Sequence, residues 1–477
     1  MEHKKISFFW ALFPILVLIA LLATNVYLYG DDSLGGANQL TLLLTAALAS
    51  IVGIKNGSSW KSIIDGVSKS IASTTPAIII LLLIGSLAGT WLISGIVPAM
   101  IYYGLQILNP KVFLVATCIV CAIVSLASGS SWSTIATIGI ALLGIGKALG
   151  ISEGLIGGAI ISGAYFGDKV SPLSDTTNLA PAMAGTDLFT HIRYMMYTTI
   201  PSFIITLIIF LFLGFSVSES NTQNIQELLI AIDNSFVISP WLFLVPISVI
   251  FMIIKKIPAL PALLVGTLMG GLFAVIFQPH IITQISGVEN NFIQASYVAV
   301  INAMGSEISI TTTNEMINDL LSTGGMYGML NTIWLILCAM MFGGVMEATG
   351  LLHRISSGII QYAKNTGSVI ATTACTCLFF NVTASDQYLS IVVPGRMYSD
   401  TFKEKGLAPE NLSRTLEDSG TVTSVLIPWN TCGATQSAVL GVATFAYLPY
   451  CFFNIISPFM TILYGYLGIK IRKLKNN

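Results

Sequence analysis

The stretch YFGDKVSPLSDTTNLAPAMAG, residues 165–185, decides the class of fold. It carries two aspartates, a lysine, two prolines and several hydroxyl side chains, yet long apolar runs flank it on both sides. Pro172 and Pro181 cannot lie in a continuous helix without freeing backbone carbonyls. Because hydrocarbon offers no hydrogen-bond partner, carbonyls freed inside a bilayer must face protein or a water-filled cavity. The stretch therefore predicts an interrupted helix that lines a cavity.

The composition supports a membrane setting for this stretch. Of the 477 residues, 54% are hydrophobic and 9% are charged, whereas soluble domains carry about 25% charged residues. Apolar runs at 8–29, 77–95 and 203–215 recur along the chain. A spanning helix needs about 20 apolar residues, so the chain has room for roughly ten such elements or more. We predict an all-α polytopic membrane protein, with 8–29 retained as its first helix because no small-residue cleavage site follows it.

A weak internal repeat relates two halves of the chain at an offset of about 256 residues. The matched residues are Ala127-Ser128 with Ala384-Ser385, Pro172 with Pro428, Gly185 with Gly441, and Phe189 with Phe445. We predict a first repeat over 1–236, with a hairpin at 112–149 and a broken helix at 153–190. The second repeat is predicted over 237–477, with a hairpin at 368–403 and a broken helix at 411–447.

The distribution of Lys and Arg indicates that the two repeats are inverted. Basic segments gather on the cytoplasmic side of membrane proteins. The basic segments are Lys4 and Lys5, the loop 55–75, Lys255 and Lys256, and the tail KIRKLK at 470–475; the segments without Lys or Arg are 30–39 (with Asp31 and Asp32), 217–236 (with Glu219, Glu227 and Asp233) and 278–330. The loop 55–75 and its counterpart 278–330 thus fall on opposite sides. This arrangement predicts both termini in the cytoplasm, and inverted repeats with broken helices are typical of secondary transporters.

The first break supplies a candidate cation site. Freed carbonyls together with Asp175, Thr176 and Asn178 form an all-oxygen environment, which suits a hard cation such as Na⁺. Asp168 and Lys169 are adjacent in sequence, so we expect them to neutralise one another in part and to take part in proton coupling. No cofactor is expected beyond the transported Na⁺, and no nucleic acid partner is expected.

The second break, SRTLEDSGTVTSVLIPWNTCGA at 413–434, supplies the matching half of the site. On a helix, Glu417, Thr421 and Ser424 would follow one face, with Asp418 beside it. Two neighbouring carboxylates in a low dielectric are hard to ionise together. We expect Glu417 and Asp418 to form one locus that takes either a proton or Na⁺. Thr421, Thr423 and Asn430 are the further oxygen ligands expected there.

The hairpin tips add hydroxyls and one acid at matching places, namely Ser128 and Ser130 in the first half and Asp386 in the second. A single Ser or Thr is more often an interior hydrogen-bonding group than a ligand. An acid inside the membrane costs about 2.5–3.5 kcal/mol even on the mildest insertion scale. Four of them, Asp175, Asp386, Glu417 and Asp418, would cost on the order of 10 kcal/mol, as much as a domain's whole stability. Structure alone does not require such groups, so the acids indicate function.

The cysteines and histidines carry no comparable signal. Cys118-x-x-Cys121 and Cys375-x-Cys377 lie inside apolar runs, where thiols behave as small apolar groups rather than as redox or metal ligands. The four histidines do not cluster in the sequence.

Two long motifs, 166–202 and 383–434, closely resemble the NhaC family of bacterial Na⁺/H⁺ antiporters. The resemblance extends over nearly the whole chain. It implies a bacterial inner-membrane antiporter, and by analogy with the wider superfamily a scaffold with a moving transport domain and a homodimer.

The resemblance also leaves an alternative open, because the family includes exchangers of Na⁺ and organic acids of the malate and lactate type. A carboxylate substrate would need a buried cation, for which Lys169, Arg193 and Arg396 are the candidates. A cation channel is less favoured because it needs no broken helix in both halves, and a membrane enzyme is less favoured still.

Overall fold

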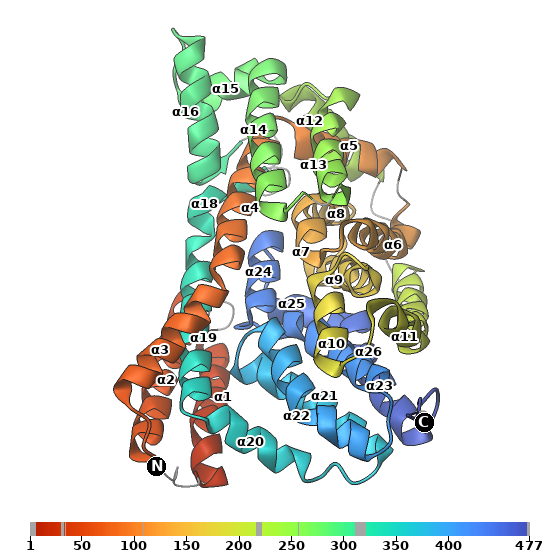
Figure 1. Ribbon diagram of the computed structural model, residues 1–477. Coiled ribbons are helices and arrows are strands. Elements are labelled where there is room, and N and C mark those ends of the chain that lie inside the picture. Colours follow the sequence, from red (N-terminus) through yellow and green to blue (C-terminus); the bar gives the residue numbers. More distant parts are fainter. Residues whose placement is uncertain are drawn as a thin grey trace.

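The computed structural model describes residues 6–29, 33, 35–107, 109–215, 222–255, 257–310 and 321–474. Lys4, Lys5, Asp31, Asp32, Glu219, Lys256 and Lys475, all used in the charge argument, lie outside these residues. Within the described residues, nine helices are long and apolar enough to cross a membrane, or eleven when two bent pairs each count as one span. The all-α polytopic class is therefore confirmed (Figure 1).

The first half of the chain forms thirteen helical elements in the described residues. They are α1 (Phe8–Tyr29), α2 (Ala37–Lys55), α3 (Trp60–Ser73), α4 (Thr75–Ile93), α5 (Ile96–Ile107), α6 (Pro110–Ser128), α7 (Ser131–Thr134), the π-helical turn η2 (Ile135–Gly139), α8 (Ile140–Ala148), α9 (Glu153–Val170), α10 (Asp175–Ala184), α11 (Leu188–Phe215) and α12 (Thr222–Ser235).

The second half is also helical apart from one short hairpin of strands. Its elements are the 3₁₀ turn η3 (Pro240–Phe243), α13 (Leu244–Ile254), α14 (Ala259–Phe277), α15 (Pro279–Ser286), α16 (Phe292–Gly305), β1 (Ile308–Ser309), β2 (Ser322–Thr323), α18 (Gly325–Gly328), α19 (Leu330–Ala348), α20 (Leu351–Ile360), α21 (Thr366–Thr383), α22 (Gln387–Glu404), α23 (Pro409–Leu416), the π-helical turn η4 (Glu417–Thr421), the 3₁₀ turn η5 (Ser424–Leu426), α24 (Thr431–Leu440), α25 (Thr444–Tyr447), the 3₁₀ turn η6 (Leu448–Tyr450) and α26 (Phe452–Leu467). β1 and β2 pair antiparallel.

Local sequence explains where the first broken helix stops and restarts. α9 ends at Val170 because Pro172 cannot continue a helix and holds the residue before it in an extended conformation. Ser174 then caps α10 by accepting from the Thr177 amide at 3.4 Å. Pro181 behaves differently from the prediction, since it lies inside α10 without ending it.

The second broken helix is more irregular than predicted. α23 passes at Glu417 into the π-helical turn η4, and Pro428 lies in the gap between η5 and α24. The expected continuous helical face through Glu417, Thr421 and Ser424 is therefore wrong, because π and 3₁₀ turns change the angle between successive side chains.

Backbone landmarks recur in the two halves at the spacing of the repeat, 256 positions apart. The pairs are Pro110 and Thr366 (starts of α6 and α21), Gly129 and Ser385 (φ 71° and 58°), Ser130 and Asp386 (N-caps), Glu153 and Pro409 (starts of α9 and α23), Ser174 and Asn430 (N-caps), and Gly185 and Gly441 (φ 83° and 67°). The sequence match at the hairpin tip is wrong by one residue, since the structural partner of Ser385 is Gly129. The limits of the repeats at 236 and 237 stay a prediction.

Equivalent helices of the two halves run in opposite directions. In Figure 1, α4 runs from α3 towards α5 near the upper end, whereas α19 runs from α18 to α20 at the lower end. Both marked chain ends lie towards the lower end, and α15 and α16 lie at the upper end. The two halves are therefore inverted relative to one another.

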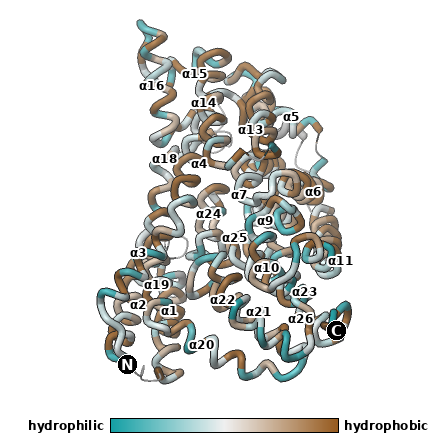
Figure 2. Tube along the Cα trace, viewed as in Figure 1, coloured by the Kyte–Doolittle hydropathy of each residue, from teal (hydrophilic) through white to brown (hydrophobic). Residues whose placement is uncertain are grey.

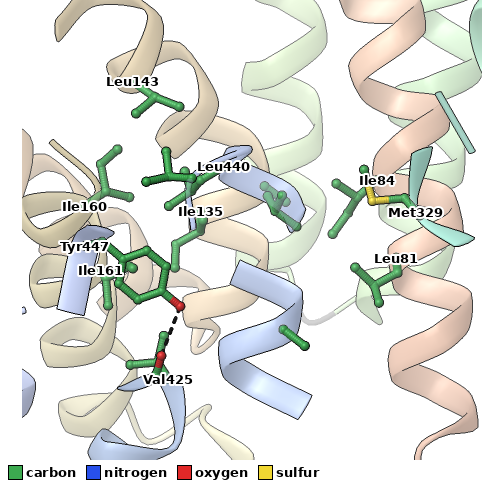
Figure 3. Packing of buried hydrophobic residues seen from close by; sticks show 14 of the residues in the cluster. Leu81, Ile84, Ile135, Leu143, Ile160, Ile161, Met329, Val425, Leu440 and Tyr447 are labelled. Atoms are coloured by element: carbon green, nitrogen blue, oxygen red, sulfur yellow. Dashed lines mark hydrogen bonds between the residues drawn. The ribbon is translucent and has the colours of Figure 1, made fainter. Parts of the chain in front are cut away.

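The halves are interleaved rather than separate bodies. α4 packs on α14, α19 packs on α2 and α3, and α10 packs on α22 and α23. Figure 3 shows Tyr447 of α25 beside Ile160 and Ile161 of α9, with its hydroxyl donating to the Val425 carbonyl at 3.0 Å. Figure 2 shows mostly apolar outer helices around paler and more polar stretches at α9, α10 and α23. The two breaks therefore face one another inside the protein.

Candidate functional site

A cavity of about 680 Å³ lies where the two hairpin tips and the first break meet α4 and the turn between α13 and α14, and Thr431 is the residue of the second break on its described wall. Six of the predicted site residues line it: Ser128, Ser130, Asp168, Asp175, Thr176 and Asp386. Gln387 and Tyr388, at the start of α22, also line it and were not predicted, although they directly follow Asp386 in sequence. Among its described lining residues the cavity carries three carboxylates and no Lys or Arg. It therefore favours a cation over an anion.

The two hairpin tips bring capping groups to the cavity wall. Ser130 Oγ accepts from the Ser133 amide at 3.1 Å, and Asp386 Oδ1 accepts from the Leu389 amide at 2.9 Å. Ser128 Oγ lies within 3.4 Å of Thr134 Oγ1. These groups hold the tips in shape, and Asp386 brings a charge as well.

Asp168 and Asp175 differ in their surroundings. Asp168 is buried, and its Oδ2 accepts from the amide and the hydroxyl of Ser131 at 3.0 and 2.6 Å. Asp175 is the first residue of α10 and is exposed at the cavity wall. Asp168 is therefore fixed in place by the hairpin, whereas Asp175 is accessible to a solvated ion.

The carbonyls freed at the first break are satisfied by side chains of α10. Thr177 Oγ1 donates to the carbonyls of Asp168 and Lys169 at 3.3 and 2.9 Å. Asn178 Nδ2 donates to the carbonyls of Pro172 and Ser174 at 3.0 and 2.7 Å. Asn178 is absent from the described cavity wall, and its amide nitrogen stabilises the break; its role as an oxygen ligand stays a prediction.

Glu417 lies one side chain behind the cavity wall. It is fully buried on η4, and its Oε1 accepts from Thr176 Oγ1 at 3.1 Å. Thr176 itself lines the cavity and lies 3.2 Å from Ser174 Oγ. Within the described part of the chain, Glu417 Oε2 and the hydroxyls of Ser419 and Thr421 have no hydrogen-bond partner. Unsatisfied buried oxygens of this kind are uncommon and indicate room for a ligand.

Asp418 has a different environment from its neighbour. Its Oδ1 forms an ion pair with Lys169 Nζ, and both side chains are fully buried. Its Oδ2 accepts from Thr198 at 2.8 Å, and Lys169 also donates to Ser457 Oγ at 2.9 Å. Lys169 thus pairs with Asp418 rather than with the expected Asp168, while the single locus of Glu417 and Asp418 stays a prediction. Thr198 and Ser457 are single polar residues in apolar helices, which gave no signal in the sequence.

The remaining predicted ligands hold the second break together. Thr423 Oγ1 donates to the Ser419 carbonyl at 2.5 Å and accepts from Asn381 Nδ2 at 2.9 Å. Asn430 caps α24 through the Cys432 amide at 3.0 Å and donates to the Asn381 carbonyl at 3.1 Å. Asn381, which the sequence reading missed, ties η4 to the second hairpin.

No resident metal centre is indicated in the described residues, where no three His, Cys, Asp or Glu side chains converge. The three cavity carboxylates are spread over its wall. A cation bound there would have to complete its shell with hydroxyl groups, carbonyls or water, which is acceptable for a weakly bound, transported ion.

Comparisons with known proteins identify the family of the chain. The model of the "Na+/H+ antiporter family" matches residues 163–469. The chain is 38% identical to the Na⁺/H⁺ antiporter NhaC of Alkalihalophilus pseudofirmus over 99% of this chain and 98% of the relative. It is 36% identical to the malate-2H⁺/Na⁺-lactate antiporter of Bacillus subtilis, covering 92% and 91%. It is 35% identical to the arginine/ornithine antiporter ArcD of Halobacterium salinarum, covering 98% and 94%.

Proposed function

Since the chain belongs to the Na⁺/H⁺ antiporter family, we propose that it is a secondary active transporter that exchanges Na⁺ for H⁺ across the membrane. The observation that carries the mechanism is Glu417, a fully buried carboxylate with one unpartnered oxygen, joined to an acidic cavity through Thr176. A transporter needs such a group because its ion site is buried within the membrane and opens to one aqueous phase and then to the other.

In the proposed cycle Glu417 holds either a proton or Na⁺. Protonation removes the charge of the carboxylate inside the protein, and Na⁺ balances the same charge. Thr176 and Thr421 are the hydroxyl groups placed to share the bound Na⁺, since Thr176 donates to Oε1 at 3.1 Å and Thr421 lies on the same turn as the acid. Asp175, exposed at the wall, attracts Na⁺ from solution.

In this proposal Asp418 and Lys169 neutralise one another and keep their charges throughout the transport cycle. Their ion pair is fully buried and receives further hydrogen bonds from Thr198 and Ser457. A buried pair of this kind is costly to separate. The net charge of the moving site therefore changes through Glu417 and the ion that it binds, while the pair stays neutral.

An inorganic cation fits the cavity better than an organic acid. Its described wall holds three carboxylates, and Lys169, the nearest buried cation, is already paired with Asp418. Arg193 and Arg396 are both exposed and are not part of that wall. Exchange of malate and lactate, the activity named for one relative, is therefore the second candidate.

The setting of the transporter follows the same reasoning. We propose a bacterial cytoplasmic membrane, both termini in the cytoplasm and a homodimer whose transport domain moves against a scaffold. The cavity supports access from the cytoplasm, because residues 73, 74, 76, 77 and 257–260 on its wall adjoin the basic segments. No catalytic chemistry is part of the proposal.

Everted membrane vesicles test the proposal directly. A pH gradient is established by respiration, and its collapse on addition of NaCl is followed by dequenching of a pH-sensitive dye. We expect collapse with Na⁺ alone, no response with choline chloride and no response in Glu417→Gln vesicles. A response that appears only when malate or lactate is present would favour the organic acid exchanger instead.

A further inference from the structure

A second pocket, of about 300 Å³, shares no lining residue with the cavity of the cation site and lies between the start of α11 and the segment that follows α26. It is lined by Thr190, Arg193, Tyr194, Tyr197, Lys470, Ile471 and Arg472. The four α11 residues are spaced at i, i+3, i+4 and i+7, so they share one face of the helix. The pocket thus joins one helical face to a chain segment 270 residues and more away.

This pocket, unlike the cation cavity, is basic. Arg193, Lys470 and Arg472 contribute charges to its wall, and the side chain of Arg414 lies directly behind it, with Cζ 4.7 Å from the ring centre of Tyr194. Two acids adjoin the wall. Glu410 is bound by Arg472 at 2.5 Å, and Asp187 accepts from the Thr190 amide at 2.9 Å. Four cations therefore face two acids.

The surroundings of Arg414 indicate that this pocket binds an anion. Arg414 is fully buried, and in the described part of the protein its Nε and Nη2 have no hydrogen-bond partner. Its Nη1 donates to the Lys470 carbonyl at 3.3 Å. A buried guanidinium with two of its nitrogens unpartnered carries a large desolvation cost. An anion seated at the pocket would offset that cost.

Hydrogen bonds hold the wall of the pocket in a fixed conformation. Lys470 has a left-handed backbone, with φ 49°, and its carbonyl accepts from both Tyr194 Oη and Arg414. The Arg472 carbonyl accepts from the Ala408 amide at 3.0 Å and from Asn411 Nδ2 at 2.6 Å. Strained backbone persists only where its surroundings hold it, and such positions cluster at ligand sites.

The position of the pocket indicates where the anion comes from. α11 begins at Leu188 and α26 ends at Leu467, so the pocket lies at the ends of two apolar helices that are candidate membrane spans, α26 as part of a bent pair. Beyond it, Tyr197, Ile200, Ile204, Ile208 and Leu211 form an exposed stripe along α11. A ligand with a negative headgroup and acyl chains matches both parts, and basic pockets between membrane helices bind anionic lipids.

We propose that this pocket binds the phosphate headgroup of an anionic phospholipid, with Arg193, Lys470 and Arg472 around the phosphate and the acyl chains along the α11 stripe. The site does not depend on which ions the protein exchanges, because none of its residues belongs to the cation site. Free inorganic phosphate shares the headgroup's chemistry, but it makes no use of the stripe.

Lipid titrations on the purified full chain test this site. Binding of phosphatidylglycerol, phosphatidylcholine and inorganic phosphate is measured by native mass spectrometry in detergent. The test protein is the double variant Arg193→Gln with Lys470→Gln, which removes two exposed charges from the pocket. The matched control is the double variant Lys61→Gln with Lys69→Gln, which removes two exposed charges from α3. We expect tighter binding of phosphatidylglycerol than of phosphatidylcholine. The variant should bind phosphatidylglycerol about 25-fold more weakly than the wild type, at about fivefold for each of the two charges removed. The control should bind it within about twofold of the wild type.

Two results would overturn the proposal. If phosphatidylglycerol binds the variant and the control equally, the pocket is not the site. If inorganic phosphate binds as tightly as phosphatidylglycerol and shows the same dependence on the variant, the ligand is a free anion and the lipid assignment is wrong. Circular dichroism and gel filtration of each variant check that it is folded.

Discussion

The two hairpins and broken helices share one backbone plan, yet they carry different chemistry. The left-handed tip, the helix cap after it, the cap of the short helix and its terminal glycine all recur 256 positions apart. The acids do not recur. The positions equivalent to Glu417 and Asp418 are Ile161 and Ser162, and those equivalent to Asp168 and Lys169 are Ser424 and Val425.

The charges are thus divided between the halves rather than doubled. The first break supplies Lys169 and the accessible Asp175, and the second supplies the buried Glu417 and Asp418. The ion pair of Lys169 with Asp418 and the hydrogen bond of Thr176 with Glu417 both cross from one half to the other. Each half is therefore incomplete alone, and the site exists only where the two breaks meet.

The largest expected effect comes from breaking the pair between the halves. Asp418→Asn leaves Lys169 as an unpaired buried cation, which costs about 3–5 kcal/mol in the free energy of unfolding. Replacing both partners, as Lys169→Met with Asp418→Leu, removes the unpaired charge and should recover most of that loss. Unfolding in a denaturant titration in detergent measures both variants. An Asp418→Asn protein as stable as the wild type would show that the pair is not formed.

A smaller effect separates the two hairpin tips. A Cβ on Gly129 would lie 2.7 Å from the Leu173 backbone carbon, and its φ of 71° disfavours any side chain. We expect Gly129→Ala to lower the free energy of unfolding by about 2–3 kcal/mol. At the equivalent tip, Ser385→Gly should change the free energy of unfolding by less than about 1 kcal/mol, because glycine adopts the left-handed conformation without steric strain. Equal effects at the two tips would contradict the shared backbone plan.

The smallest effect concerns the bridge between cavity and acid. Thr176→Val removes the hydroxyl that donates to Glu417, so apparent Na⁺ affinity should fall by about 5–30-fold, equivalent to about 1–2 kcal/mol. Thr177→Val is the matched control, because Thr177 donates to the carbonyls of Asp168 and Lys169 instead. Na⁺ titrations of exchange rate in proteoliposomes measure both. A Thr177→Val protein with the larger loss of Na⁺ affinity would place the ion elsewhere.

The sequence was informative where one residue acts on the backbone beside it. Pro172 predicted the first break, and its repeat partner Pro428 lies in the second. The expense of acids in a membrane singled out Asp175, Asp386, Glu417 and Asp418, of which Asp175 and Asp386 line the cavity. The sequence was uninformative where the direction of a side chain decides which partner it contacts. Glu417 and Asp418 are neighbours in sequence, but a π-helical turn points them to different partners.

The sequence also did not predict contacts between residues that lie far apart along the chain. Lys169 meets a residue 249 positions away rather than the acid beside it, and no local pattern encodes that choice. Thr198 and Ser457, which complete the surroundings of Asp418, are isolated polar residues in apolar helices. Only the packing of the two halves brings these groups together.

The central claim is that Glu417 is the carboxylate at which Na⁺ and H⁺ replace one another. Na⁺-driven proton movement in proteoliposomes, measured between about pH 6 and pH 9 for the wild type, Glu417→Gln and the exposed control Glu404→Gln, tests it most directly. Because protons compete with Na⁺, the wild type and the control should need about tenfold more Na⁺ for each pH unit of acidification while the site is protonated. Glu417→Gln should show no exchange at any pH. Near-normal exchange in Glu417→Gln, or a half-saturating Na⁺ concentration that does not change with pH in the wild type, would contradict the account.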